Sequence, residues 1–189
     1  SLLSLSNEQQ HLLERWMNEL LQHRPIQYVI NEAWFQNMKF EVDERVLIPR
    51  PETEELVEWI VNEESKRQPL TILDIGTGSG CIPISLKKRL GNSVIHTCDV
   101  SSGALELAKV NANNLGADIN FHKVDFLSKA SREALPEVDI VVSNPPYIPQ
   151  SGHAMMDKHV VEFEPSLALF VPDEDALVFY KAIGAFVKE

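Results

Sequence analysis

A short segment of the chain joins a side-chain amide to two prolines. An apolar run typical of a buried strand ends at Ser143, and Asn144, Pro145, Pro146 and Tyr147 follow. A buried amide needs hydrogen-bonding partners, and the two prolines fix the backbone while removing two N–H donors. Neighbouring carbonyl oxygens are therefore left free to accept hydrogen bonds from another molecule. The segment predicts a rigid corner that is rich in acceptors.

A glycine-rich loop stands between a predicted strand and a predicted helix. It consists of Gly76, Thr77, Gly78, Ser79 and Gly80. Glycine lets the backbone turn sharply and lets a ligand approach without a Cβ in the way, and the helix offers its first N–H groups. A dinucleotide-binding loop would need glycine or alanine at Cys81. The spacing is instead similar to the first motif of class I S-adenosylmethionine (SAM) methyltransferases. Asp74, just upstream, suits the α-ammonium group of such a ligand; the alternative is a simple tight turn.

Acidic residues also follow the second and third predicted strands. Asp99 at the tip of the second strand is a candidate acceptor for both ribose hydroxyls; the alternative is a residue of a solvated loop or a helix cap. After the third strand, Asp125 is a candidate for the adenine amino group and Phe126 for the ring face. The alternative for this pair is an ordinary turn aspartate beside a core phenylalanine.

The Asn144 corner follows the fourth predicted strand, which neighbours the first in a doubly wound sheet. It is therefore expected beside the cofactor, with Asn144 in contact with it. The pattern [D/N]-P-P-[Y/F/W] is similar to the fourth motif of methyltransferases that act on planar nitrogen. The Asn144 side-chain oxygen and the Pro145 carbonyl would accept both N–H bonds and aim the nitrogen at the SAM methyl group. The alternative is a rigid turn with an asparagine cap.

Taken together, the chain resembles the HemK/PrmC family, which methylates the glutamine amide of the GGQ motif in bacterial peptide-chain release factors. The resemblance rests on residues 45–59, 144–149 and 163–169. It implies SAM as cofactor, S-adenosylhomocysteine (SAH) as product and a release factor as partner. It also implies that the glycine loop holds the methionine part, that Asp99 holds the ribose and that Phe126 lies beside the adenine. Residues 144–147 would hold the glutamine amide. The substrate-side wall would include Phe35, Arg50, Pro51 and Glu52.

Two other functions stay open at this point. An adenine amino-methyltransferase for DNA or RNA could use the same corner on a flipped base, and a SAM-binding module could lack catalysis. The net charge of −11 argues against broad binding to nucleic acid. The six histidines show no metal-ligand spacing, and no run approaches the length of a membrane span. Two cysteines and no export signal indicate a reducing, cytoplasmic setting.

The elements that must position these residues alternate strand and helix from residue 70 onward, which predicts an α/β fold with a parallel, doubly wound sheet. Strands are expected at 70–75, 94–99, 119–124 and 138–143, in the order 3-2-1-4. Helices are expected at 81–90, 102–115 and 175–188. Upstream, the patterns predict helices over 6–22 and from 51 to about 64. Between them, extended pieces are expected at 26–30, at 35–42 with a polar turn inside, and at 46–48.

The composition also suggests how the chain divides. Residues 1–24 are expected to be a remnant of an N-terminal helical docking domain, and residues 25–66 a hairpin linker with the first helix. Residues 67–189 are expected to form the methyltransferase domain, incomplete at its C-terminus because a fifth strand should follow. The fourth strand would then leave an apolar edge of the sheet open.

Overall fold

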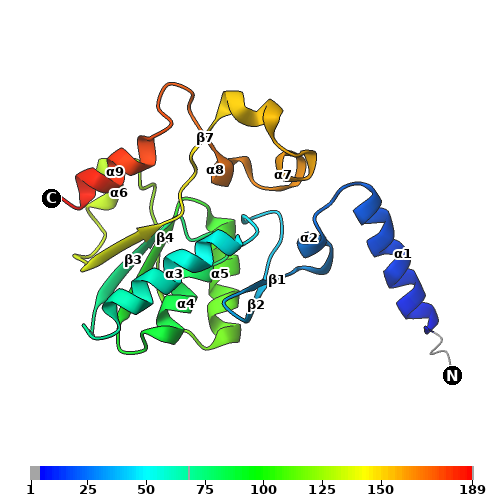
Figure 1. Cartoon of the computed structure of the whole chain (residues 1–189), viewed down its shortest axis with the longest axis horizontal. Helices are drawn as coiled ribbons and strands as arrows, with labels where there is room; N and C mark the ends of the chain where they lie inside the picture. The colour runs from blue at the N-terminus through cyan, green and yellow to red at the C-terminus, as the bar shows by residue number, and fades with distance from the viewer. Residues whose placement is uncertain (1–4, 68, 189) are drawn as a thin grey trace.

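A computed structural model describes residues 5–67 and 69–188 of the chain. Within them, a parallel sheet contains β3 (Thr71–Ile75), β4 (Val94–Asp99), β5 (Asn120–Lys123) and β6 (Ile140–Ser143). The strand order is β5-β4-β3-β6, which confirms the predicted order and leaves β6 at an edge of the sheet (Figure 1).

Helices cover both faces of this sheet. One face carries α3 (Pro51–Glu64), α4 (Cys81–Arg89) and α5 (Ser102–Leu115), whose apolar side chains share one core with Ile72 and Ile95. The other face carries α6 (Lys129–Arg132) and α9 (Val178–Phe186), and its smaller core contains Leu73 and Ile75. Alternation along β3 therefore sends successive side chains to opposite layers, as expected of a strand buried on both sides.

Local signals fix where these helices begin and end. Pro51 is the first residue of α3, and the acidic residues of the first turn interact favourably with the positive end of the helix dipole. The Ser101 hydroxyl accepts from the backbone N–H of Ala104 at 3.2 Å to begin α5, and Gly116 ends it with φ +61°. Both helices have the bounds that the sequence predicts.

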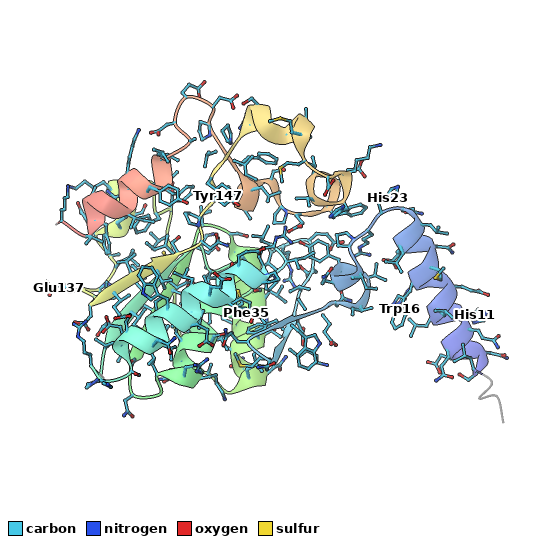
Figure 2. The ribbon with its side chains drawn as sticks, in the orientation of Figure 1. His11, Trp16, His23, Phe35, Glu137 and Tyr147 are labelled. Atoms are coloured by element: carbon cyan, nitrogen blue, oxygen red, sulfur yellow. The ribbon has the colours of Figure 1, made fainter. Side chains whose placement is uncertain are left out.

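The N-terminal part lies to one side of the sheet. The first helix, α1 (Asn7–Leu21), begins with a capping box of Ser6 and Gln9. It extends away from the body of the molecule and buries none of its residues; Trp16 is on this helix (Figures 1 and 2).

Residues 26–30 form a helix, α2 (Ile26–Ile30), so the prediction of an extended piece is wrong there. Pro25 sets the N-cap, and burial of Tyr28 and Val29 on one side favours a helical turn over a strand. Asn31, with φ +53°, ends the turn.

A two-stranded hairpin follows, made of β1 (Glu32–Phe35) and β2 (Met38–Glu41). Gln36 and Asn37 both have positive φ, which is the backbone that a two-residue hairpin turn requires. The Asn111 side chain on α5 accepts from the Glu41 N–H at 2.7 Å and donates to the Glu41 carbonyl at 2.9 Å. This pair of bonds docks the hairpin on α5.

Two connecting segments lie over the carboxyl edge of the sheet. Residues 46–48 belong to no strand, and side chains bond their backbone groups: the Tyr28 hydroxyl donates to the Val46 carbonyl at 2.6 Å. The later segment contains β7 (Ile148–Pro149), a 3₁₀ helix η1 (Gln150–Met155), α7 (Lys158–Phe163), α8 (Ser166–Leu169) and β8 (Phe170–Val171). None of the helices described in the structure has the length and apolar character needed to cross a membrane.

His96 on β4 and His122 on β5 form a pair. Nδ1 of His96 lies 2.9 Å from Nε2 of His122, and the ring centroids are 5.2 Å apart. A hydrogen bond between two imidazoles requires one of them to be neutral. Burial lowers the pKa of both rings, and the neighbouring charge of His122 lowers that of His96 further. The folded state therefore binds fewer protons near pH 6 than the unfolded state.

We expect this pair to make the fold less stable in mild acid. Its contribution is present above the unfolded pKa of about 6.5 and is lost as the pH falls toward the lower folded pKa. The free energy of unfolding, measured by urea denaturation between about pH 5 and 7, should rise with pH less steeply in His122→Gln than in the wild type. His159→Gln, an exposed change on α7, is the control. Equal slopes in the wild type and His122→Gln would contradict the expectation.

Candidate functional site

Strand register brings the predicted corners together. Ile75 at the end of β3 is paired with Cys98 on one side and with Ser143 on the other. The Cys98 carbonyl accepts from the Gly76 N–H at 2.9 Å, and the Ser143 hydroxyl donates to the Ile75 carbonyl at 2.7 Å. The chain segments that start at Gly76, Asp99 and Asn144 therefore leave the sheet side by side at its carboxyl edge.

The glycines of the loop differ in what surrounds them. A Cβ built on Gly76 or Gly78 meets nothing within 4 Å, so the loop faces open space there. A Cβ on Gly80 would lie 3.0 Å from Ile84 Cδ1 and 3.2 Å from Ala108 Cβ. The first two glycines are thus placed for a ligand, whereas the third allows the loop to pack against α4 and α5.

Asp99 anchors the loop from the neighbouring strand. Its Oδ2 accepts from the Gly78 N–H at 3.1 Å, and its Oδ1 accepts from the Ser101 N–H at 2.9 Å. Burial raises the pKa of Asp99, and hydrogen bonds from backbone N–H groups oppose the rise. Each carboxylate oxygen keeps a lone pair, so the side chain can accept from two neighbouring hydroxyl groups of a ligand.

A pocket at this edge collects most of the predicted cofactor residues. It is lined by Gly76, Gly78, Asp99, Asp125, Phe126 and Asn144. Phe126 is 4% exposed because its ring packs against Phe186, with centroids 5.5 Å apart, and against the Arg132 guanidinium. Asp125 is exposed, and its Oδ1 accepts from the Leu127 N–H at 3.0 Å.

Asp74, Thr77 and Ser79 are buried and do not line this pocket. Asp74 is fully buried, its Oδ2 accepts from the Thr97 hydroxyl at 2.6 Å, and burial raises its pKa to about 7. Within residues 5–67 and 69–188, Asp74 Oδ1 and the hydroxyl groups of Thr77 and Ser79 have no hydrogen-bond partner. The structure therefore places the predicted α-ammonium acceptor behind the loop rather than on the pocket wall.

The Asn144 corner separates this pocket from a second one. The Asn144 side-chain nitrogen Nδ2 donates to the Thr53 hydroxyl at 3.1 Å. Asn144 lines both the first pocket and a second pocket, whose wall also contains Pro145 and Tyr147. Tyr147 is 57% exposed above the end of the sheet (Figure 2), and Pro146 lines the first pocket.

Of the four residues predicted for the substrate-side wall, only Arg50 lines the second pocket. Its side chain donates to Glu164 at 2.6 Å. Pro51 and Glu52 are exposed in the first turn of α3 and line neither of these two pockets. Phe35 is 1% exposed because it packs edge-on against Phe40 in the core under the hairpin, away from Tyr147 (Figure 2).

Several residues at this edge were not predicted. The first pocket is also lined by Arg45, Val46 and Leu47, by Leu167 and Ala168, and by Phe179 of α9. Glu164 ties the two covering segments together: its buried carboxylate accepts from the Ile48 N–H at 3.2 Å as well as from Arg50. A signal for Glu164 was present, since it lies in the family-like segment 163–169, but nothing in the sequence shows its partner.

The part of the chain that the structure describes contains no cluster of metal-ligating side chains. Groups of three or more His, Cys, Asp or Glu side chains that could hold a metal ion are absent there.

The sequence is similar to those of known methyltransferases. The family model for the methyltransferase small domain matches residues 52–163. The release factor glutamine methyltransferase of Flavobacterium psychrophilum is 47% identical over 184 residues, which cover 96% of this chain and 64% of that protein. The corresponding protein of Streptococcus pneumoniae is 43% identical over 179 residues, which cover 95% of this chain and 62% of that protein. The chain thus spans slightly less than two thirds of the length of these curated relatives.

A solved structure supports the fold. The hMettl16 catalytic domain, crystallised with the MAT2A 3′UTR hairpin 6, is 22% identical; the match covers 79% of this chain and 56% of that chain, with a TM-score of 0.58. At this identity the likeness shows the fold alone, and it confirms the predicted doubly wound architecture. The resemblance to release factor glutamine methyltransferases is confirmed by the relatives named above. Because the family model matches more than half of its residues, the chain belongs to the methyltransferase small domain family.

Proposed function

We propose that this protein transfers a methyl group from SAM to the side-chain amide nitrogen of the glutamine in the GGQ motif of peptide-chain release factors. The observation that carries the proposal is the position of Asn144, which lines both pockets at the carboxyl edge of the sheet. A methyl donor in the first pocket and an amide in the second would meet at this side chain. The names of the relatives supply the substrate class.

The first pocket has the donor set that a nucleoside with an amino-acid tail requires. Asp99 offers carboxylate oxygens to the ribose hydroxyls, and the open side of Gly76 and Gly78 leaves room for the methionine part. Phe126 and Asp125 line the remaining wall for the adenine. When bound, SAM supplies an electrophilic methyl group on a sulfonium centre.

The amide nitrogen of glutamine is a poor nucleophile because its lone pair is delocalised into the carbonyl group. The side-chain Oδ1 of Asn144 and the backbone carbonyl of Pro145 are acceptors for its two N–H bonds. Pro146 has no N–H that could compete for the Pro145 carbonyl. Fixed acceptors at both N–H bonds orient the nitrogen and favour its pyramidal form, so positioning and electrostatics carry the reaction.

The setting fits an enzyme of translation termination in the cytoplasm. Cys81 and Cys98 are both free and buried, and the net charge of −11 suits a protein partner better than a long nucleic acid.

Asp99→Ala should weaken SAH binding by about 1–3 kcal/mol, because the ribose loses a charged acceptor and Gly78 loses its anchor. Isothermal titration calorimetry measures the change. Asp118→Ala removes an exposed carboxylate just before β5, at the opposite edge of the sheet, and should leave the affinity unchanged. Normal SAH affinity in Asp99→Ala would exclude the ribose assignment.

Asn144→Ala should abolish methyl transfer while changing SAH affinity little, because the amide oxygen meets the substrate nitrogen. Tritiated SAM is offered with a release factor, with a release factor whose GGQ is changed to GGA, and with duplex DNA or RNA. We expect label only in the GGQ protein and only with Asn144 present. Label in nucleic acid would favour an adenine amino-methyltransferase, and wild-type transfer by Asn144→Ala would refute the proposed role of this residue.

A further inference from the structure

Thr53 is a polar side chain on the buried stripe of a helix. Thr53, Val57 and Val61 are spaced four residues apart on α3 and are 7%, 0% and 8% exposed. Val57 and Val61 belong to the apolar core against the sheet, whereas Thr53 lies one turn nearer the helix start, beside the carboxyl edge. Valine has nearly the same shape as threonine, so packing alone does not explain the hydroxyl group.

The hydroxyl group contacts Asn144, a polar residue that lines both pockets. Asn144 Nδ2 donates to Thr53 Oγ1 at 3.1 Å. An amide NH₂ group can only donate, so the Thr53 oxygen is the acceptor in this contact. The donor end of the Asn144 amide is held by α3, and Oδ1 is the end that remains for a ligand.

The direction of this amide decides what it can bind. The two ends of an asparagine amide have nearly the same shape and opposite hydrogen-bonding character. A reversed Asn144 would turn its NH₂ group toward the N–H bonds of a substrate amide, so donors would face donors. In the structure Nδ2 is turned to Thr53 on the protein side, which leaves Oδ1 on the ligand side before the substrate arrives.

We propose that Thr53 is a positioning residue, which fixes the Asn144 amide so that Oδ1 rather than Nδ2 meets the substrate nitrogen. The catalytic part of this inference rests on the proposed function, since it requires a substrate that donates N–H bonds. The structural part concerns only Thr53 and Asn144 and can be measured without substrate.

The first measurement is the hydrogen exchange of the Asn144 side-chain amide by ¹⁵N NMR, with the signal assigned by its loss in Asn144→Ala. Thr53→Val keeps the shape and removes the acceptor, so exchange of the Nδ2 protons should become about tenfold faster. Thr53→Ser keeps the acceptor and should behave like the wild type. Unchanged exchange in Thr53→Val, with a thermal unfolding midpoint like that of the wild type, would overturn the inference.

The second measurement is methyl transfer at saturating SAM. We expect Thr53→Val to lower kcat about tenfold with unchanged SAH affinity, and Thr53→Ser to remain within about twofold of the wild type. Asn144→Asp should retain weak activity, and in that background Thr53→Val should change kcat by less than about twofold, because both carboxylate oxygens are acceptors. An equal loss in both backgrounds would mean that Thr53 acts through packing, which would overturn the inference.

The two measurements also separate this inference from the function on which it rests. If the Thr53 variants change amide exchange as expected but the wild type labels no release factor, the positioning of Asn144 is supported and only the proposed function fails.

Discussion

The pairing of β3 with a neighbour on each side is the constraint on which the site depends. Parallel strands bring their carboxyl ends to the same edge, and the register of Ile75 with Cys98 and Ser143 decides which residues emerge there together. A shift of one residue along β6 would turn Asn144 to the other face of the sheet and away from Thr53. The glycine loop, the Asp99 carboxylate and the Asn144 corner are close because the sheet is built in this register.

A second set of contacts holds segments that are distant in sequence over this edge. The Glu164 side chain is 1% exposed and bonds both Arg50 and the Ile48 N–H, across more than a hundred residues. Arg50 is 33% exposed, so the ion pair is only partly buried, and the buried Glu164 carboxylate is the end that requires partners. Asn111 also joins distant segments, because its side-chain nitrogen donates to the carbonyl of Glu41 in the hairpin and to the carbonyl of Ser79 in the glycine loop. The first pocket therefore takes its walls from the linker and from the segment after β7 as well as from the sheet.

The sequence predicted those features of the fold that depend on local residue patterns and on the order of the strands. Alternating strands and helices predicted the order of the sheet, and Pro51 predicted a helix start. Residues 26–30 were misread because a short apolar run fits a strand or a helical turn equally well, and tertiary burial decided between them.

Placement of side chains around the site was harder to predict. Phe35 fitted a substrate wall by resemblance alone, yet it packs on Phe40 in the core. Asp74 lies behind the loop that it was expected to complete, because the pleat of β3 turns its side chain toward Thr97. Thr53 and Glu164 depend on contacts with partners about 90 to 115 residues away, which no local pattern reports.

A crystal structure with SAH and a glutamine peptide in the GGQ context tests the central claim most directly. The account predicts SAH in the pocket with Asp99 and the glutamine amide nitrogen within about 3.2 Å of both Asn144 Oδ1 and the Pro145 carbonyl oxygen. In that structure Asn144 Nδ2 should still donate to Thr53. A glutamine amide bound away from Asn144 would contradict the account, and so would an Asn144 that presents its NH₂ group to the ligand.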